Sequence, residues 1–473
     1  MNIVLLNPPF KGAYNREVRF QAVSPQKALH PPIMLAYAAA VCIEEKHKVD
    51  LIDAPALELG KAKTVERVKQ FKPELIVMLT STGSVQSDGL LALELKELLP
   101  KALMVAVGVH ATAVPDDTLQ KGFDAVARGE YEYTVRDLAA GKKLKDVLGL
   151  SYKKGESTIH NTQRPLIKNL DELPFPARHL LPNEKYYSAI YKNPFTFILA
   201  GRGCPHQCIF CATPQIMNDR RYRMRSPENV VAELEHIKKN FPKLKSVLFN
   251  DDTLNVNKKH LAELCNLITE RKVNLPWAAY SRVDTIDGES AMLMKKAGCF
   301  LVKVGFESGV DTILQNMKKG TNATTKQALK AAEIFRKSGI QVHGTFVFGM
   351  PGETKETMKQ TVEFAKKLDI DFVQFSVAQP YPGTEFFAYL KKNSYLRFEN
   401  WAEYLDEEGC IHPIFEYPHL KADEMEKQLH SAYKSYYLRP KYVLKAIGQR
   451  LTNPELLKTS LRSGMSLLKY IFS

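Results

Sequence analysis

Three closely spaced cysteines are the most chemically distinctive feature of this sequence. Cys204, Cys208 and Cys211 are separated by three and then two residues, and they account for three of the seven cysteines in the chain. They follow the apolar run 195–199, so a predicted strand delivers a short loop that carries three thiols. Four thiolates would complete the coordination of a metal or cluster, whereas three leave one position open. We therefore expect an iron–sulfur cluster with one iron that no cysteine binds.

Two other interpretations of these cysteines remain open at this point. His206 lies between the first two cysteines and would complete a zinc site, but a residue inside the loop is poorly placed to close a tetrahedron. The cysteines would alternatively be incidental thiols, although chance rarely produces such spacing. The cluster is the favoured hypothesis.

The cysteine spacing resembles the CxxxCxxC signature of the radical SAM superfamily. Phe210 occupies the aromatic position that often precedes the last cysteine of that signature. The resemblance implies a [4Fe-4S] cluster whose open iron is chelated by the amino and carboxylate groups of S-adenosylmethionine (SAM). A motif of this kind is a hypothesis until the surrounding elements agree with it.

Length and composition indicate a soluble protein of two or three domains. The chain has 473 residues, 45% of them hydrophobic and 25% charged, which is typical of globular proteins. It contains no uninterrupted apolar run of about 18 residues and no signal peptide at its N-terminus. The odd number of scattered cysteines favours a reducing compartment over a disulfide framework. We therefore expect a cytoplasmic location.

The net charge of +14 is concentrated at the C-terminus. Residues 434–473 contain eight Lys or Arg against one Glu, a net charge of +7. Leucine and isoleucine recur there at helical spacing between the basic residues, which is a basic amphipathic pattern. We expect either a helix that packs on the rest of the protein or an interfacial helix at anionic lipid, which would place the protein peripheral to a membrane.

The N-terminal third predicts a parallel sheet. Apolar runs at 2–7, 48–53, 75–79 and 103–107 alternate with helical stretches, which favours a Rossmann-like domain over residues 1–145. Ligands bind such sheets at the carboxyl ends of the strands. These ends are small, polar and rich in glycine, so they either approach a large cofactor or form ordinary turns. The candidate residues are Pro8, Thr80, Ser81, Gly83, Gly108, His110, Gly129 and Glu130.

This N-terminal segment resembles the cobalamin-binding domain that precedes one large branch of radical SAM enzymes. The matching pieces are Asn7-Pro-Pro, His30-Pro-Pro, Gly108-Val-His110-Ala and Gly129-Glu-Tyr-Glu132. The resemblance implies that the candidate residues contact cobalamin. One departure matters, because Pro55 stands where related domains with an Asp-x-His-x-x-Gly motif supply a histidine to cobalt. We expect the lower face of cobalamin not to be held by that histidine, and we do not assign His110 as a ligand.

The remainder of the chain predicts a second sheet and a C-terminal extension. Six apolar runs, each followed by polar residues, predict parallel strands at 195–199, 246–249, 276–280, 300–306, 341–348 and 372–377. A partial (β/α)6 barrel over 195–385 is the radical SAM architecture. We expect an irregular, proline-containing linker at 146–194, whose sequence Leu-Pro-Phe-Pro-Ala-Arg178 is similar to that between the two domains of the resembled family. We also expect a mainly helical, basic region at 386–473.

Motif positions assign the polar strand ends to SAM. The resemblance implies that Asp251 and Asp252 receive its ammonium group, although an N-cap pair is the alternative. Arg282 would meet the carboxylate of SAM, or else form a structural ion pair. Glu307 and Ser308 match the strand end that contacts the ribose.

Two further positions complete the candidate site. Gly349 would let the backbone pass close to adenine, or else serve an ordinary tight turn. Tyr381 lies in a proline-rich loop near the expected substrate entrance, where a tyrosine is either catalytic or simply packed. Its catalytic role is a speculative assignment.

These features favour a cobalamin-dependent radical SAM enzyme. It would cleave SAM reductively to a 5′-deoxyadenosyl radical and act on an unactivated carbon, with methyl transfer as the leading outcome. Ring formation, rearrangement or oxidation of a lipid-like or polycyclic substrate is the first alternative. We expect a small-molecule or lipid-like substrate and a reductant such as flavodoxin or ferredoxin.

Two further classes are less compatible with the sequence. An RNA-modifying methylthiotransferase would need three more cysteines in the N-terminal domain, which has only Cys42, so a nucleic-acid substrate is not expected. A non-enzymatic Fe–S, zinc or cobalamin-binding scaffold would leave the six ordered strand ends unexplained.

Overall fold

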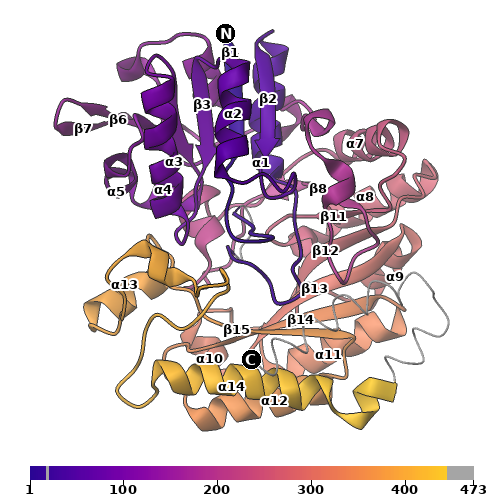
Figure 1. The fold of residues 1–473 in the computed structure, drawn as a ribbon. Coiled ribbons are helices and arrows are strands. Elements are labelled where there is room, and N and C mark those ends of the chain that lie inside the picture. The colour runs from indigo at the N-terminus through magenta and orange to yellow at the C-terminus, as the bar shows by residue number, and fades with distance from the viewer. Residues whose placement is uncertain (17–20, 445–473) are drawn as a thin grey trace.

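The N-terminal sheet has the strand order expected of an open α/β domain. The computed structural model describes residues 1–16 and 21–444 of the chain (Figure 1). Within these residues the first sheet has seven strands, in the order β2-β1-β3-β4-β5-β6-β7. Its parallel strands are β1 (Asn2–Asn7), β2 (Lys48–Asp53), β3 (Leu75–Leu79), β4 (Leu103–Val107) and β5 (Ala125–Ala127). The order reverses at β1 and β3, where such sheets bind ligands.

Alternating side chains of β1 bury against helices on opposite faces of this sheet. Ile3 and Leu5 pack in one cluster with residues of α1 (Ile33–Glu44) and α6 (Glu132–Ala139), whereas Val4 and Leu6 pack in another with α2 (Lys61–Phe71) and α3 (Val85–Leu98). Two buried faces explain the unbroken apolar sequence of the strand. The short helices α4 (Val109–Ala113) and α5 (Pro115–Gln120) follow β4.

The sheet extends beyond residue 145, where the sequence predicted an irregular linker. Strands β6 (Leu150–Lys154) and β7 (Ser157–His160) form a hairpin that continues the sheet antiparallel from β5. Gly155 makes the turn with a positive φ of 61°. The prediction was wrong for this segment because the hairpin is short and mostly polar beyond residue 152. Residues 161–194 contain only short 3-10 turns, and Arg178 there is buried and donates to Phe197 O at 2.6 Å.

The second sheet confirms the six predicted strands. In the part of the chain that the structure describes, this sheet is fully parallel and has the order β15-β14-β13-β12-β11-β8. Its strands are β8 (Phe195–Ile198), β11 (Ser246–Phe249), β12 (Trp277–Arg282), β13 (Cys299–Glu307), β14 (Gln341–Phe348) and β15 (Phe372–Val377). The sheet is an open barrel, since β8 and β15 are its two edges.

Helices cover the outer face of this barrel. They are α7 (Pro227–Asn240), α8 (Lys258–Glu270), α9 (Gly288–Lys296), α10 (Asp311–Asn316), α11 (Thr325–Lys337) and α12 (Lys355–Leu368). Ser226 caps α7, because its side chain accepts a hydrogen bond from Asn229 N. The alternation of strands and helices places the carboxyl ends of all six strands at one end of the barrel.

Tyrosines of the C-terminal helix complete the backbone hydrogen bonds of edge strand β15. Helix α14 (Ala422–Tyr437) runs along this edge (Figure 1). The hydroxyls of Tyr433, Tyr436 and Tyr437 donate to the carbonyls of Phe375, Ile370 and Val373 at 2.6–3.0 Å, and Tyr437 also accepts from Val373 N. The hydroxyls therefore do for this edge what a neighbouring strand would do.

The described part of the C-terminal region, residues 386–444, is less helical than predicted. Between α13 (Glu385–Lys392) and α14, the chain forms isolated bridges and one 3-10 turn, Trp401–Tyr404, because its aromatic residues pack between the two domains rather than along one helix face. The predicted basic amphipathic tail falls largely on residues 445–473, which lie outside the described residues. Among the described residues, every helix is too short or too polar to cross a bilayer.

Buried ion pairs join the two domains. Arg202 lies just before the cysteine loop and is 3% exposed. It donates to Glu132 Oε1 at 2.6 Å and to Glu130 Oε1 at 3.3 Å, both in the N-terminal domain. Arg223 also donates to both carboxylate oxygens of Glu130, at 2.7 and 3.0 Å. Although burial opposes ionisation, the charges of Arg202 and Arg223 hold the pKa of Glu130 below its usual value.

We expect Arg202→Met to destabilise the protein by about 3–5 kcal/mol, because Glu132 would remain buried without its charged partner. Arg221→Met is the matched control, since the Arg221 side chain is 85% exposed and its pair with Asp219 contributes only about 0–1 kcal/mol. Urea denaturation of anaerobically purified protein measures both variants. Equal effects of the two substitutions would contradict the assigned role of Arg202.

Candidate active site

Two glycines and a short antiparallel pair fix the start of the cysteine loop. Strands β9 (Gly201–Arg202) and β10 (Arg223–Met224) pair with each other just before Cys204. A Cβ atom at Gly203 would lie 2.1 Å from Arg221 O, and the φ of Gly203 is +93°. Glycine is therefore required here, which explains the Gly-Arg-Gly sequence ahead of the thiols.

Gln215 holds the cysteine loop in place by donating to backbone carbonyl groups of the loop. The side-chain amide Nε2 of Gln215 donates to the carbonyls of Cys208, Ile209 and Cys211 at 3.2, 3.1 and 2.8 Å. Its Oε1 accepts from Glu385 N at 3.0 Å, which ties the loop to α13. Sequence analysis missed Gln215, since nothing in its local pattern distinguishes it from a surface glutamine.

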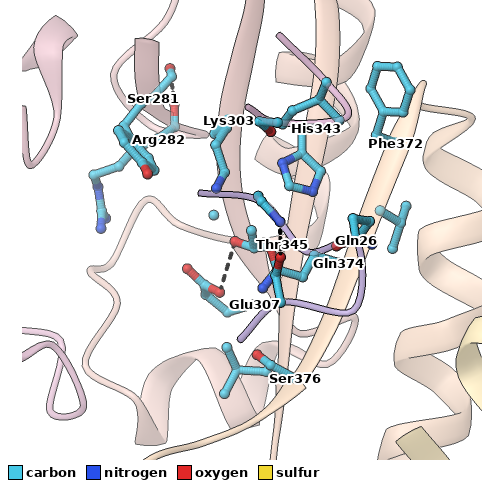
Figure 2. A pocket seen from close by; sticks show the side chains of 18 of the residues that line it. Gln26, Ser281, Arg282, Lys303, Glu307, His343, Thr345, Phe372, Gln374 and Ser376 are labelled. Carbon is cyan, nitrogen blue, oxygen red and sulfur yellow. Dashed lines mark hydrogen bonds between the residues drawn. The ribbon is translucent and has the colours of Figure 1, made fainter. Parts of the chain in front are cut away.

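The loop opens onto a cavity of about 360 Å³ inside the barrel. The three cysteines line this cavity together with Asp252, Arg282 and Glu307, as the sequence predicted from separate strand ends. Figure 2 shows Arg282 and Glu307 among the lining side chains. Its other sides are closed by Tyr437 and Tyr442 of the C-terminal region and by five residues of the N-terminal domain, Asn15, Ser24, Gln26, Ala28 and His30. All three parts of the chain therefore build the site.

Arg282 brings a fixed positive charge to the cysteines. Its Nη1 lies 3.7 Å from Cys208 Sγ, while Nε and Nη2 each donate to Asp284 at 2.9 Å. The bidentate pair with Asp284 fixes the guanidinium plane. A cation in this position stabilises thiolates and can also receive a carboxylate at the open side of the cluster.

Glu307 has a strained backbone at the end of β13. Its φ is +66°, in the left-handed region that a glutamate rarely adopts, and the pairing of β13 with β14 shifts register here. Its carboxylate accepts from Lys319 Nζ at 2.6 Å and from Thr345 Oγ1 at 3.5 Å. Strain of this kind is concentrated at functional sites, where surrounding contacts hold it.

Four of the site residues predicted at the barrel strand ends lie outside the cavity lining. Asp251 is fully buried and accepts from Ala200 N at 3.0 Å and Tyr222 OH at 2.8 Å, and burial raises the pKa of Asp251 to about 6. Ser308 accepts from Val310 N at 3.2 Å and contacts Thr361. The structure therefore gives Asp251 and Ser308 packing contacts and leaves Asp252 and Glu307 facing the cavity.

Gly349 and Tyr381 are the other two. A Cβ at Gly349 would lie 2.7 Å from Phe415 and 2.9 Å from Met425, and Gly349 O accepts from Tyr417 OH at 2.9 Å. C-terminal residues thus cover the turn that was predicted to approach adenine. Tyr381 is buried, and its hydroxyl accepts from Gln21 N at 3.4 Å. Its position fits the packing alternative.

The carboxyl edge of the N-terminal sheet carries the predicted hydroxyl groups, but residues 10–16 cover them. Ser81 contacts Tyr14 OH at 2.8 Å, and Thr80 Oγ1 donates to Val107 O at 3.1 Å. The buried guanidinium of Arg16 donates to Pro8 O at 2.7 Å and Asp88 Oδ1 at 2.9 Å. The donor set fits loops that bind a large polar cofactor, yet in this conformation the chain itself uses these groups.

The remaining candidates at this edge are also packed. A Cβ at Gly83 would lie 2.5 Å from Leu405 Cδ1, and one at Gly108 would lie 2.5 Å from Thr80 O, so close packing requires both glycines. The backbone N–H of Gly129 donates to Thr112 Oγ1 at 3.0 Å. Glu130 forms the ion pairs between the domains described above.

His110 is enclosed by its neighbours. Its ring nitrogens lie 3.3 Å from Thr82 Oγ1 and 3.5 Å from Asp117 Oδ2, and its ring packs edge-on against Trp401. Burial lowers the pKa of His110, which keeps the imidazole neutral. Both ring nitrogens of His110 therefore have partners within the protein.

The loop after β2 is occupied by packing contacts. Asp53 is fully buried and accepts from Asn7 Nδ2 and from Tyr186 OH, each at 2.8 Å. Burial raises the pKa of Asp53 to about 6. Ala54 and Ala56 flank Pro55 and are also buried, so small apolar residues take the place of an imidazole here.

The fold and the thiol site together define a class of protein: a Rossmann-like domain followed by an open β/α barrel with a three-cysteine cluster loop. Among the described residues, no three His, Cys, Asp or Glu side chains lie close enough together to hold a single metal ion. Three thiols that share a cavity, with Arg282 beside them, fit a cluster with an open iron.

Comparisons with known proteins agree with this class. Residues 198–365 match the family model of the radical SAM superfamily, and residues 23–139 match that of the B12 binding domain. The chain is 35% identical over 453 residues to the uncharacterized methyltransferase PH0819 of Pyrococcus horikoshii, covering 94% of this chain and 95% of that protein. The chain therefore belongs to the radical SAM enzymes that carry a B12-binding domain. Its cofactors are a [4Fe-4S] cluster, SAM and cobalamin.

More distant proteins share the same architecture. The anaerobic magnesium-protoporphyrin IX monomethyl ester cyclase of Rubrivivax gelatinosus is 25% identical over 427 residues, which cover 87% of this chain and 75% of that protein. The structure of the radical SAM methyltransferase TsrM from Kitasatospora setae, with cobalamin and a [4Fe-4S] cluster bound, superposes with a TM-score of 0.70. It has 19% sequence identity and covers 93% of this chain and 89% of that one. This similarity confirms the predicted fold of two α/β domains.

We expect Gln215→Glu to reduce the iron bound per protein after reconstitution. A carboxylate oxygen in place of Nε2 would face three carbonyl oxygens and leave them unsatisfied, at about 1–3 kcal/mol for each buried group. Gln360→Glu, on the exposed face of α12, is the matched control. Iron analysis and the absorbance of the cluster measure the effect, and unchanged iron content in Gln215→Glu would refute this role.

Proposed function

We propose that this protein is a cobalamin-dependent radical SAM methyltransferase that methylates an unactivated carbon. The observation that carries the proposal is the single cavity shared by the three cysteines, Asp252, Arg282 and Glu307. A methyltransferase is also the relative that aligns over nearly the whole chain. The substrate is a small molecule that enters the barrel cavity.

The residues around the cavity have complementary roles toward SAM. Arg282 would receive the carboxylate of SAM beside the cluster, and Asp252 would receive its ammonium group. Glu307 would accept hydrogen bonds from the ribose hydroxyls, with its carboxylate held in place by Lys319. These contacts would hold the sulfonium of SAM near the cluster, which would supply the electron for reductive cleavage of the sulfur–C5′ bond.

The cofactors supply the electron and the methyl group. The cluster supplies the electron that cleaves SAM, and cobalamin supplies the methyl group that the substrate receives. The protein's own contribution is to orient the radical carbon toward one substrate C–H bond and to keep water and oxygen away, through the aromatic residues that close the cavity. We propose flavodoxin or ferredoxin as the one-electron donor, and a cytoplasmic location.

A ring-forming or oxidising reaction is the second candidate. The 25% identity to an anaerobic cyclase over 87% of this chain favours it. Peripheral membrane contact through the basic residues 434–473 would suit a lipid-like substrate of either reaction. Vesicle sedimentation of the full chain and of a variant with these lysines and arginines changed to glutamine tests that contact.

We expect the reconstituted enzyme to produce 5′-deoxyadenosine and S-adenosylhomocysteine from SAM, and Cys208→Ala to abolish both. Loss of one thiolate removes a cluster ligand, and the electron for SAM cleavage comes from the cluster. Cys410→Ala is the control, because Cys410 is not among the residues that line the cavity. Anaerobic incubation with SAM, reductant and methylcobalamin, followed by chromatography, measures both products.

The ratio of the two products distinguishes the candidates. S-adenosylhomocysteine that depends on cobalamin supports methyl transfer, whereas deoxyadenosine alone favours ring formation or oxidation. A protein that binds no iron and yields neither product would refute the radical mechanism.

We expect His110→Gln to leave the electron paramagnetic resonance spectrum of bound cob(II)alamin unchanged, because Thr82, Asp117 and Trp401 enclose the imidazole. Loss of a nitrogen splitting in this variant would instead identify His110 as a cobalt ligand. Cob(II)alamin bound to the wild-type protein gives the reference spectrum.

A further inference from the structure

The barrel wall of the cavity consists of two rows of side chains in register. Residues two apart on a strand face the same side, so aligned residues on neighbouring strands form rows across the sheet. The inner row contains Tyr280, Lys303, His343 and Phe372. The outer row, nearer the carboxyl ends, contains Arg282, Gly305, Thr345 and Gln374. All eight residues line the cavity (Figure 2).

Cations in and above the outer row already have carboxylate partners. Arg282 pairs with Asp284 at 2.9 Å, and Lys319 pairs with Glu307 at 2.6 Å. Gly305 leaves room for the second pair, because a Cβ there would lie 2.2 Å from Glu307 Oε1 and 2.8 Å from Lys319 Nζ. This part of the cavity is therefore balanced in charge before any ligand enters.

Lys303 differs from these cations. Among the described residues, Lys303 Nζ forms neither an ion pair nor a hydrogen bond, and its contact is the ring of Tyr280, with 5.1 Å to the centroid. The lysine interrupts the apolar run Phe300-Leu-Val-Lys-Val-Gly-Phe306 and points into the cavity beside His343 (Figure 2). A strand interior is an unfavourable place for a lysine unless its charge meets a ligand.

Two uncharged imidazoles flank this lysine. His343 is 7% exposed, and the Nδ1 atoms of His343 and His30 are buried without hydrogen-bond partners among the described residues. Burial and the charge of Lys303 lower the pKa of both histidines, that of His30 to about 3. A neutral imidazole offers one N–H donor whose position is fixed by packing, so both rings can donate to an acceptor at the inner row.

We propose that the inner row binds an anionic group of the substrate, a carboxylate, phosphate or phosphonate, through Lys303 and His343. Phe372 and Tyr280 supply aromatic surface beside that group, so the substrate carries its acid function next to an apolar or planar portion. That this ligand is the substrate rests on the proposed function. The binding of an acid at Lys303 does not depend on that function.

The strand geometry separates this anion site from the SAM carboxylate. The Glu307 carboxylate lies beside Gly305, which is two residues from Lys303 on β13, or about 7 Å along a strand. Arg282, next to Cys208, is the cation that lies beside the cluster. A SAM molecule held at the cluster and at Glu307 therefore occupies the outer row and leaves the inner row to another ligand.

Lys303→Met tests the proposal, because methionine keeps the length and apolar stem of lysine without its charge. Lys303→Arg retains the charge, and Lys330→Met on the exposed face of α11 is the matched control. Three probes share one aromatic scaffold: 3-phenylpropionate, 2-phenylethylphosphonate and the neutral 3-phenylpropionamide. Ligand-detected NMR titration of the reconstituted holoenzyme without reductant gives their affinities in the absence of turnover, and SAM affinity is measured alongside.

We expect the wild-type enzyme and Lys330→Met to bind both acids more tightly than the amide. Lys303→Met should weaken the acids roughly tenfold or more, as loss of a charge-assisted hydrogen bond does, with little change for the amide, and Lys303→Arg should restore the preference. The better bound acid distinguishes a carboxylate from a phosphonate group.

Three results would overturn the proposal: no preference for acids in the wild type, equal weakening of acid and amide probes, or loss of SAM affinity in place of acid affinity. Failure of the proposed function would appear separately, as absent deoxyadenosine or S-adenosylhomocysteine, because these binding measurements involve no turnover.

Discussion

The buried contact of Arg202 with Glu130 and Glu132 is the interaction on which the rest of the site depends. It lies two residues before Cys204, between glycines that allow β9 and β10 to pair, and its partners belong to the other domain. A buried charge without its partner is strongly destabilising, so this contact holds the two domains in a fixed relative position. The same contact therefore sets where the cluster loop lies relative to the N-terminal sheet, which belongs to the cobalamin-binding domain.

Charge is divided along the cavity in a way that separates two ligands. Beside the cysteines, Arg282 and Lys319 each have a carboxylate partner, and these pairs orient Arg282 and Glu307. Deeper in the barrel, Lys303 has aromatic and neutral imidazole neighbours. A zwitterion such as SAM suits the balanced region, whereas an acid suits the inner row. The open barrel edge matters here, since Tyr437 of α14 and residues between 24 and 30 complete the wall that a closed barrel would provide.

The sequence predicted the strands and the thiols well because both leave local signals. Apolar runs that end in polar residues located all six barrel strands, and cysteine spacing located the cluster. Side-chain direction beyond a strand end has no such signal: Asp251 and Asp252 are adjacent, yet Asp251 binds Ala200 N and Tyr222 while Asp252 faces the cavity. Long-range contacts were equally hidden, since Gln215 acts through carbonyl groups, and the 150–160 hairpin pairs with β5 through its backbone. A lysine within an apolar strand was the one local signal left unused.

The carboxyl edge of the N-terminal sheet combines a predicted binding surface with contacts inside the protein. Its hydroxyl groups bond Tyr14 and Arg16, and Asp53 bonds Tyr186 of the segment between the domains. In domains with the Asp-x-His-x-x-Gly motif, the loop after this strand supplies an imidazole, whereas here Ala54, Pro55 and Ala56 pack against the protein. Moving the buried Asp53 would leave Asn7 and Tyr186 without their hydrogen-bond acceptor, so the contacts of this loop stabilise the fold. We therefore expect the lower face of cobalamin to meet a different surface. His110 at this edge is already held by its contacts with Thr82, Asp117 and Trp401.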